Sequence, residues 1–352
     1  MKIILTGGGT AGHVTPNIAL LPTLAKLGYS VEYIGSHNGI ENGLINLCGI
    51  PYHSISSGKL RRYFDMKNFT DVFRIIKGLC DSLLLLRKIK PNVIFSKGGF
   101  VAVPVAIAAA MLKIPIVIHE SDITPGLATR IALPFAKVMC ASFPETIRNN
   151  NKGVLTGSPI RQELLNGDKS AAMNLCGFNN LPKKPIILVI GGSLGAVAIN
   201  KHIFELLPKL LQDFHIIHIC GKGNALQDAQ AGYAPFEYLQ DELPAVFAAA
   251  DLIISRAGAN TLFELLALKK PHLLIPLTKA ASRGDQLLNA ASFEKQGFSM
   301  VLHEEELSAD TLYNALAALY HNQDDYIAKM QAHQTADGIT KIVEEIKRWT
   351  KK

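Results

Sequence analysis

Two glycine-rich turns in the first third of the chain have the composition of phosphate-binding loops. Residues 7–12 read Gly-x-Gly-x-x-Gly and follow an apolar run at 2–5, and residues 96–100 follow a second run at 92–95. Glycines let backbone N–H groups approach a phosphate, and a following helix N-terminus favours the anion. The two turns predict a diphosphate cradle, the alternative being tight packing turns without a ligand. The glycines expected to contact the diphosphate are Gly8, Gly9, Gly98 and Gly99.

A dinucleotide cofactor is not expected at the first turn. Such a site wants an Asp or Glu at the carboxyl end of the second strand, where it holds the ribose. The predicted second strand, residues 30–34, runs into Gly35-Ser36-His37, and Glu32 lies in its middle. This arrangement counts against NAD, and no cofactor is expected.

Titratable side chains follow two of the predicted strands. His13 comes directly after the first glycine turn, where it could act as a base or hydrogen-bond a substrate; the alternative is a histidine that bonds only the backbone. His119, Glu120 and Asp122 follow the run at 114–118 and form a candidate acid/base cluster. No Asp-x-Asp occurs and His-x-x-Asp is not a metal-ligand spacing, so no metal is expected. Helix dipoles and backbone amides would then have to stabilise a diphosphate leaving group.

The second half of the chain carries a comparable set of polar residues. Small residues at 255–261 open a predicted helix with Glu264 near its start. A carboxylate there could accept both hydroxyls of a ribose while the helix N-terminus faces a diphosphate, although a capping acid is common at such a position. Gln286 and Asn289 are three residues apart and share one helix face, which either meets a sugar or is solvated.

Parallel strands joined by helices would position these residues. Runs rich in Val, Ile and Leu predict strands at 2–5, 30–34, 92–95, 114–118 and 137–140 and, later, at 186–190, 214–219, 252–254, 272–275 and 299–302. The strand–glycine turn–helix pattern of the N-terminus restarts at residue 186, which indicates two doubly wound α/β domains. We expect an N-terminal domain at 1–161, a C-terminal domain at 162–339, and a last helix, about 340–352, that packs back on the first domain.

Composition narrows the class of protein. The chain has 352 residues, 48% of them hydrophobic and 18% charged, so it can bury two cores. Its five cysteines are scattered without a Cys-x-x-Cys, which argues against a disulfide framework or a structural zinc. No apolar run reaches the roughly 18 residues that span a bilayer, and no signal peptide is recognisable, so a soluble or peripheral protein is expected.

The net charge of +7 divides unevenly, with +10 on residues 1–161 and −3 on the rest. A basic N-terminal half implies an anionic partner there. Residues 59–90 hold nine Lys and Arg among apolar residues, a pattern that could rest on anionic lipid headgroups. A core-packing helix with a solvated basic face is the alternative. No motif of a nucleic-acid module accompanies the stretch, and no nucleic acid is expected.

Taken in order, seven motifs resemble the MurG family of glycosyltransferases over essentially the whole chain. They are TGGGTAGHVTPN, SKGGFVAVP, IHESD, TGSPIR, IGGSLGA, SRAGANTLFE and RGDQLLNA. The resemblance implies inverting transfer of GlcNAc from UDP-GlcNAc to the 4-hydroxyl of MurNAc in undecaprenyl-diphospho-MurNAc-pentapeptide, giving the β-1,4-linked lipid disaccharide precursor of peptidoglycan. It implies the GT-B glycosyltransferase fold, in which two Rossmann-like doubly wound domains face across a cleft. The C-terminal domain would hold UDP-GlcNAc.

The same resemblance places the N-terminal domain against the anionic inner leaflet, at the cytoplasmic face of the bacterial cell membrane, with cell-wall or division proteins as candidate partners. Carried over by motif, Thr10, Ala11 and Gly12 would lie near the donor sugar and the acceptor diphosphate. The residues that would meet UDP-GlcNAc are Arg161 and Ser193 at the diphosphate, Ala259, Asn260, Thr261 and Glu264 at the nucleotide, and Gln286 and Asn289 at the GlcNAc hydroxyls.

The resemblance leaves the general base and the acceptor less settled. His13 is the first candidate for the base and Glu120 the second. Many family members read His-Glu-Gln-Asn where residues 119–122 of this chain read His-Glu-Ser-Asp. The Asp122 side chain could accept a sugar hydroxyl, act as a base, or mark a different acceptor. A glycosyltransferase with another lipid acceptor such as diacylglycerol, a non-catalytic paralogue that binds the lipid precursor, and a UDP-sugar epimerase remain as alternatives.

Overall fold

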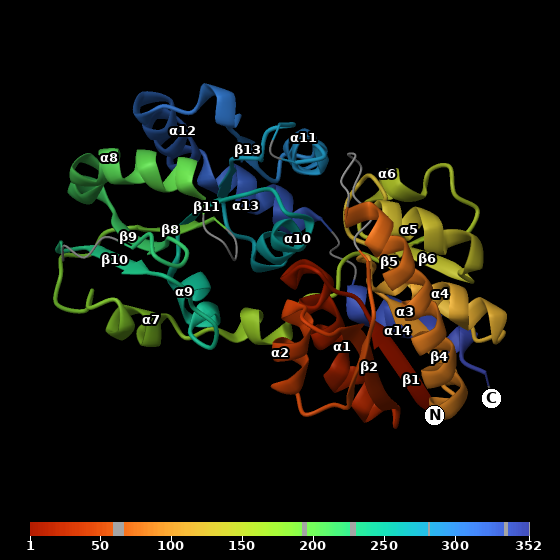
Figure 1. The fold of residues 1–352 in the computed structure, drawn as a ribbon. Helices are drawn as coiled ribbons and strands as arrows, with labels where there is room; N and C mark the ends of the chain where they lie inside the picture. The colour runs from red at the N-terminus through yellow and green to blue at the C-terminus, as the bar shows by residue number, and fades with distance from the viewer. Residues whose placement is uncertain (59–66, 192–195, 226–229, 281, 334–336, 352) are drawn as a thin grey trace. The chain divides into compact units, whose positions relative to one another are not determined.

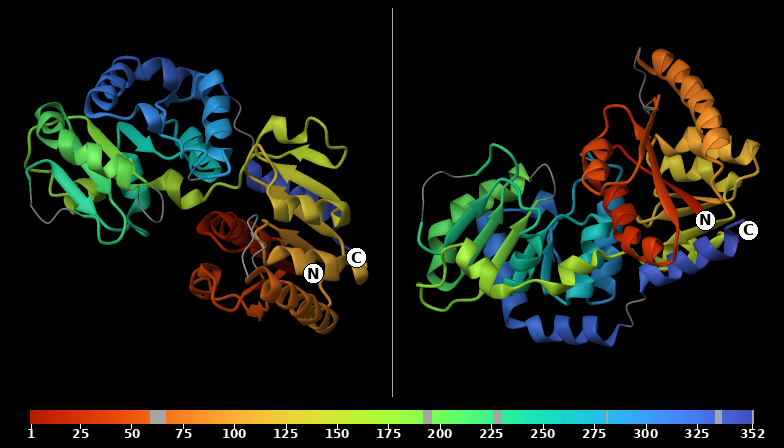
Figure 2. Two further views of the ribbon diagram at one scale, coloured as in Figure 1. Left: turned by 45° about the horizontal axis from the view of Figure 1, so that its top comes forward. Right: turned by 90° about the horizontal axis from the view of Figure 1, so that it is seen from below.

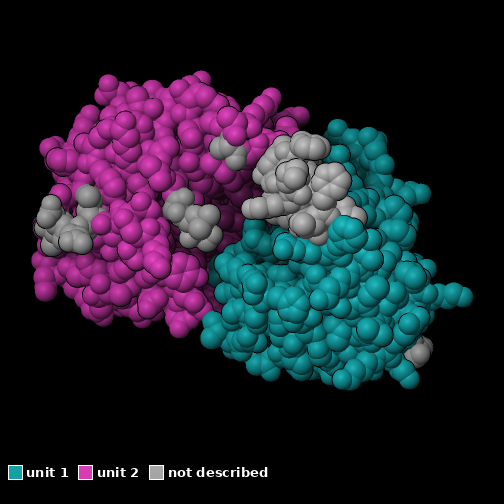
Figure 3. Space-filling view, in the orientation of Figure 1, with its two compact units in different colours: residues 1–161, 336–352 teal, residues 162–335 magenta. Residues whose placement is uncertain are grey.

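The chain forms two compact units, coloured separately in Figure 3. Unit 1 comprises residues 1–161 and 336–352, and unit 2 comprises residues 162–335. The computed structural model describes residues 1–58, 67–191, 196–225, 230–280, 282–333 and 337–351. Within these residues, no helix combines the length and the apolarity needed to cross a bilayer.

Unit 1 is built on a seven-stranded parallel sheet in the order β3-β2-β1-β4-β5-β6-β7 (Figure 1). The strands are β1 Lys2–Thr6, β2 Ser30–Ser36, β3 Tyr52–Ile55, β4 Val93–Ser96, β5 Ile116–Glu120, β6 Val138–Ala141 and β7 Gly153–Leu155. Strand β1 pairs with β2 on one side and β4 on the other, Leu5 lying opposite both Tyr33 and Phe95. The order of the strands therefore reverses between β1 and β4, where open sheets of this kind bind ligands.

Helices cover both faces of this sheet because its side chains alternate between two buried clusters. Ile3 and Leu5 pack with α1 and α14, whereas Ile4 packs with α3 and α4 on the other face. The helices of unit 1 are α1 Thr15–Lys26, α2 Ile40–Asn46, α3 Lys67–Ile89, α4 Ala102–Met111, α5 Leu127–Ala132, α6 Pro144–Ile147 and α14 Gly338–Trp349, with 3-10 turns η1 Ala11–His13 and η2 Leu133–Phe135.

The last helix, α14, completes the core of unit 1. Its buried face of Ile339, Ile342, Val343 and Ile346 belongs to the same cluster as β1 and α1. Both ends of the chain meet at Asn92, whose side chain accepts from the Lys2 N–H at 2.7 Å and donates to the Lys351 carbonyl at 2.9 Å. Figure 2 accordingly marks the two termini close together in both views.

Unit 2 repeats the plan with a six-stranded parallel sheet in the order β10-β9-β8-β11-β12-β13. Its strands are β8 Ile186–Ile190, β9 His215–Ile219, β10 Tyr233–Phe236, β11 Leu252–Ser255, β12 His272–Leu274 and β13 Met300–Val301. Its helices are η3 Gln162–Asn166, α7 Lys169–Leu175, α8 Val197–Asp213, α9 Leu243–Ala249, α10 Ala259–Leu268, α11 Asp285–Lys295, η4 Glu304–Glu306, α12 Ala309–His321 and α13 Gln323–Ala332. The predicted pair of doubly wound α/β sheets is confirmed.

Two histidines are buried as neutral side chains in the sheet of unit 2. His272 donates from Nδ1 to the Lys270 carbonyl at 2.7 Å, which leaves Nε2 to accept from the Ser299 hydroxyl at 2.5 Å. His218 donates from Nε2 to the Asn200 amide oxygen at 3.0 Å and accepts from Tyr233 at 3.2 Å. Burial lowers the pKa of each imidazole to about 4.

We expect the stability of unit 2 to fall as the pH drops below the ordinary histidine pKa of 6.5. Below that pH the histidines of the unfolded chain bind protons, whereas the buried histidines of the native state stay neutral. Each histidine therefore contributes about 3 kcal/mol to the free energy of unfolding near neutral pH, and this contribution is lost as the pH approaches about 4. Chemical denaturation between about pH 7 and about pH 4 measures this slope. His272→Gln should flatten it and the exposed His321→Gln should not; equal slopes in both variants would contradict the assignment.

Candidate functional site

The two glycine turns of unit 1 meet at the carboxyl ends of β1 and β4. A Cβ on Gly99 would lie 2.2 Å from the Gly8 carbonyl oxygen, so the two backbones are in direct contact. Gly99 also has a φ of +80°, which glycine adopts without strain. The predicted approach of the two turns is therefore realised by residues that leave no space for a side chain.

The first turn is held from behind by Glu41, a residue that sequence reasoning missed. Its carboxylate is fully buried at the start of α2 and accepts from the Gly9 N–H at 3.2 Å, and from the N–H and hydroxyl of Ser36 at 3.0 and 2.6 Å. A Cβ on Gly8 would come within 2.5 Å of this carboxylate. Nothing in the local sequence distinguishes Glu41 from an ordinary acid in the first turn of a helix.

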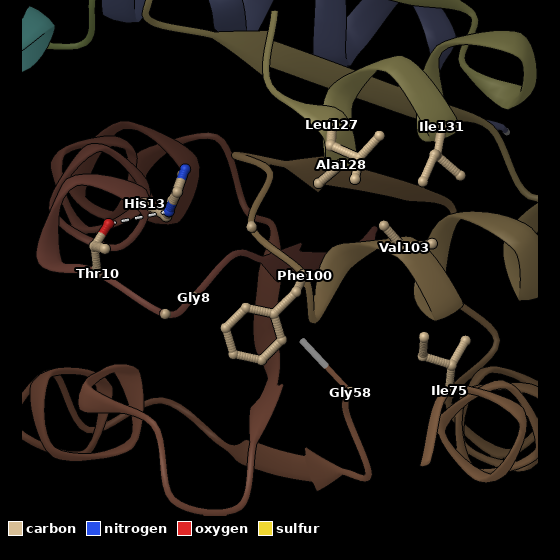
Figure 4. Close-up of a pocket in the computed structure, with 12 residues that line it drawn as sticks. Gly8, Thr10, His13, Gly58, Ile75, Phe100, Val103, Leu127, Ala128 and Ile131 are labelled. Carbon is tan, nitrogen blue, oxygen red and sulfur yellow. Dashed lines mark hydrogen bonds between the residues drawn. The ribbon is translucent and has the colours of Figure 1, made fainter. Parts of the chain in front are cut away.

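A pocket of about 250 Å³ opens beside the two turns (Figure 4). Its polar end is formed by the glycine turns with Thr10 and His13, and its other end is apolar. The apolar lining comes from α3, α4, α5 and the residue after the second turn, and consists of Ile75, Phe100, Val103, Leu127, Ala128 and Ile131. Such a shape suits a ligand with a polar or anionic head and a hydrocarbon tail.

His13 lies at the polar end of this pocket and is half-buried. Its Nδ1 is 3.1 Å from the hydroxyl oxygen of Thr10, and its carbonyl accepts from the Asn17 amide at 3.3 Å. Ala11 and Gly12 lie in the same 3-10 turn, η1. The predicted residues of the first motif are thus brought together around one imidazole.

The acidic residues after β5 do not line this pocket. The Glu120 carboxylate accepts from the Asp122 N–H at 3.1 Å, the Gly126 N–H at 3.0 Å and the Thr129 hydroxyl at 2.7 Å. These hydrogen bonds hold the loop before α5. Both carboxylate oxygens of Glu120 therefore already accept hydrogen bonds from this loop and from α5. His119 is buried, donates to the Gly157 carbonyl at 3.0 Å, and has its pKa lowered well below the ordinary value by burial and by Lys97.

The polar residues predicted for unit 2 gather at the corresponding edge of its sheet. Strands β8 and β11 are neighbours there, and α10 begins at Ala259 directly after the turn that follows β11. Asn260, Thr261 and Glu264 lie on this helix and are half-buried. In the glycine turn that follows β8, residues 192–195, which include Ser193, lie outside the described residues.

Two of the predicted sugar contacts have structural partners in unit 2. Asn289 is completely buried on α11 and donates to the Ala257 carbonyl at 3.3 Å, so its amide holds the turn before α10. Gln286 accepts from the Leu277 N–H at 3.1 Å. Arg161, predicted to meet a diphosphate, is half-buried as the last residue of the first segment of unit 1.

No group of three or more His, Cys, Asp and Glu side chains in the described part of the chain is arranged to hold a metal ion.

The Glu32 carboxylate, which sequence analysis placed in the middle of its strand, pairs with Lys2 at 3.1 Å and His53 at 2.7 Å. It therefore lies away from the carboxyl end of β2, where a dinucleotide site would need it.

Comparison with known proteins agrees with this geometry. The chain matches the sequence models of the glycosyltransferase family 28 N-terminal domain over residues 3–140 and C-terminal domain over residues 186–346. It is 54% identical, over 99% of its own length and 98% of the other's, to the UDP-N-acetylglucosamine--N-acetylmuramyl-(pentapeptide) pyrophosphoryl-undecaprenol N-acetylglucosamine transferase of Clostridium tetani. The crystal structure of Acinetobacter baumannii MurG is similar with a TM-score of 0.75 at 26% identity, covering 99% of both chains.

The two Rossmann-like parallel sheets have the GT-B glycosyltransferase fold, as expected. The fold alone is not decisive, because a putative UDP-N-acetylglucosamine 2-epimerase from Listeria monocytogenes reaches a TM-score of 0.72 at 11% identity. At more than half identity over its full length, the chain belongs to the MurG family, and the family resemblance is confirmed.

We expect Gly99→Ala to destabilise unit 1 more than Gly49→Ala. Both glycines have a positive φ, +80° and +69°, but a Cβ at position 49 meets nothing within 4 Å. We expect the Gly99→Ala variant to lose about 1–3 kcal/mol more free energy of unfolding than the Gly49→Ala variant, and this difference measures the collision with the Gly8 carbonyl. Denaturant titration of the two variants measures it, and equal losses would show that the turns can separate without cost.

Proposed function

We propose that unit 1 holds undecaprenyl-diphospho-MurNAc-pentapeptide in the pocket beside the glycine turns, and that unit 2 holds UDP-GlcNAc. The chain is an N-acetylglucosaminyltransferase of the MurG family, and it transfers GlcNAc between these two substrates. The observation that carries the assignment is the pocket itself, since glycine turns, one imidazole and an apolar wall occur together there.

The chemistry of the lipid acceptor matches the two ends of this pocket. Its diphosphate would lie against the turns at Gly8, Gly9, Gly98 and Gly99, with Thr10, Ala11 and Gly12 beside the sugar. The Gly9 N–H already donates to Glu41 and the Gly98 N–H to the Ser96 hydroxyl at 3.3 Å, so other N–H groups of the turns would receive the diphosphate. The first isoprene units would lie on the apolar wall formed by residues such as Val103 and Ile131. Because MurNAc is linked directly to the diphosphate, its hydroxyls would then lie near His13.

His13 is the base in this proposal. If its Nδ1–H donates to the Thr10 hydroxyl oxygen, 3.1 Å away, then Nε2 carries a lone pair and can accept the proton of the MurNAc 4-hydroxyl. The acceptor O4 forms a bond to C1 of GlcNAc while the bond from C1 to the UDP oxygen breaks and its electron pair leaves with UDP. A single displacement inverts the α-linked donor to a β-1,4 linkage. Glu120, already the acceptor of three hydrogen bonds, is a weaker candidate.

The donor would use the ligand edge of unit 2. Glu264 would accept the ribose hydroxyls, the N-terminus of the ten-residue helix α10 would face the diphosphate, and Ala259, Asn260 and Thr261 would line the nucleotide. Arg161 and Ser193 would add charge and a hydroxyl at the diphosphate, and Gln286 would meet GlcNAc. Asn289 would act by fixing the turn before α10.

We expect His13→Ala to lower kcat by about 10²–10⁴-fold, the usual contribution of a general base. The dissociation constant of UDP-GlcNAc should stay within about twofold, because the donor belongs to unit 2. Steady-state transfer to the lipid acceptor and donor binding by calorimetry measure the two quantities. Near-normal turnover in this variant would remove His13 from the base role and return attention to Glu120 and Asp122.

Helix α3 supports the proposed contact with an anionic membrane surface. Phe73, Ile76 and Leu84 are exposed by 74%, 54% and 66%, and Arg74 and Lys77 are exposed among them. Such a mixed face suits the boundary between headgroups and acyl chains. The opposite side of α3 packs on α4, and its residue Ile75 lines the acceptor pocket, so the membrane-facing helix borders the acceptor site. Residues 59–66 of the predicted basic stretch lie outside the described residues.

Replacing Arg74, Lys77 and Arg87 with Glu should weaken binding to vesicles that contain anionic lipid, because each reversal removes an attraction of about 1 kcal/mol and adds a repulsion. UDP affinity should not change. The matched control replaces Lys26, Lys341 and Lys347, exposed on α1 and α14 at the other face of the sheet. Vesicle co-sedimentation compares the two triple variants, and equal binding would make α3 a packed helix with a solvated basic face.

A further inference from the structure

Lys97 is a buried cation beside the proposed acceptor site, and the function described above does not use it. It is the first residue after β4, directly before Gly98, and only 2% of it is exposed. Its N–H donates to the Thr6 carbonyl at 2.9 Å, and a Cβ built on Gly7 would approach its own Cβ to 3.2 Å. The stem of Lys97 therefore fills the space beneath the two glycine turns.

The ammonium of Lys97 reaches across to the loop that follows β5, the neighbouring strand. There it donates a hydrogen bond to the hydroxyl oxygen of Ser121, which is itself buried. Burial lowers the pKa of this lysine to about 8, against the carboxylates of Glu120 and Asp122, which raise it. The group is therefore mainly charged at neutral pH.

Burying a charged side chain costs free energy that an apolar side chain in the same space would not cost. A buried lysine is therefore expected to have an electrostatic role. None of the described residues that line the acceptor pocket is a Lys or Arg. The Glu41 carboxylate accepts from the Gly9 N–H of the first turn, and the Glu120 carboxylate accepts from the hydroxyl of Thr129, which a Cβ built on Gly98 would approach to 3.6 Å. An anionic diphosphate at the turns would therefore bind near these two carboxylates, and Asp122 follows Glu120 by two residues in the chain.

We propose that Lys97 is a positioning residue whose ammonium, held at Ser121 between Glu120 and Asp122, offsets the carboxylates of these two residues and thereby permits a diphosphate to bind at the glycine turns. This inference rests on the acceptor site proposed above.

The test measures binding of geranyl diphosphate to the full chain by calorimetry, without donor, so that turnover does not enter. Lys97→Met should raise the dissociation constant about tenfold, because it leaves the carboxylates uncompensated. The double variant Lys97→Met/Asp122→Asn should recover to within about threefold of the unmodified chain. Lys26→Met, which removes an exposed lysine from the same unit, is the matched control and should bind normally.

A double variant as weak as Lys97→Met would overturn the charge pairing and leave Lys97 a packing residue. UDP-GlcNAc binding and thermal melting check that each variant is folded. Should Lys97→Met fail to fold, Asp122→Asn alone decides, since removing a carboxylate next to a retained ammonium should tighten geranyl diphosphate binding by about threefold. Unchanged or weaker binding in that variant would also overturn the inference. Failure of the unmodified chain to bind geranyl diphosphate would instead overturn the acceptor site itself.

Discussion

The contact between the Gly8 carbonyl and Gly99 is the constraint on which the site in unit 1 depends. It brings two loops from neighbouring parallel strands together with no side chain between them, and residues of both turns line one pocket together with the His13 imidazole. Parallel strands place their carboxyl ends at one edge of a sheet, and the reversal of strand order between β1 and β4 separates the helices that follow. The strand order of the sheet places the pocket at this edge, and the glycines of the two turns allow their backbones to approach each other there.

The buried carboxylates of Glu41 and Glu120 in unit 1 accept hydrogen bonds from backbone N–H groups. Glu41 fixes the first glycine turn, and Glu120 fixes the loop that leads into α5. A carboxylate that accepts several hydrogen bonds from N–H groups holds a loop firmly, because breaking any one bond leaves a buried polar group unpaired. This division leaves His13 as the side chain at the pocket with the means to take a proton. It also places two carboxylates near the glycine turns, and the proposed role of the buried Lys97 depends on them.

The two units share one sheet plan, which the proposed acceptor and donor sites use for different ligands. In each unit the first strand lies beside the fourth, β1 beside β4 and β8 beside β11, and open sheets of this kind bind ligands at such a junction. The pattern of continuous Val, Ile and Leu runs predicted the central strands, because those strands are covered on both faces. Strands β3, β7 and β10 were not expected, and each is an edge strand. Edge strands are short and half-covered, so their apolar pattern is too weak to distinguish them from loops.

Local sequence indicated which loops could hold a phosphate, offered His13, Glu120 and Asp122 as candidate bases, and determined that the chain contains two parallel α/β domains, because glycine turns and apolar periodicity are properties of neighbouring residues. Tertiary structure alone decided that Glu41 supports the first turn, that Glu120 and Asn289 are occupied by backbone groups, and that Lys97 reaches Ser121. The contacts of Glu41, Asn289 and Lys97 join segments that follow different strands, whereas Glu120 binds groups of the loop after its own strand. A side chain's partners across a sheet depend on strand order and depth of burial, and neither is encoded in the residues on either side of it.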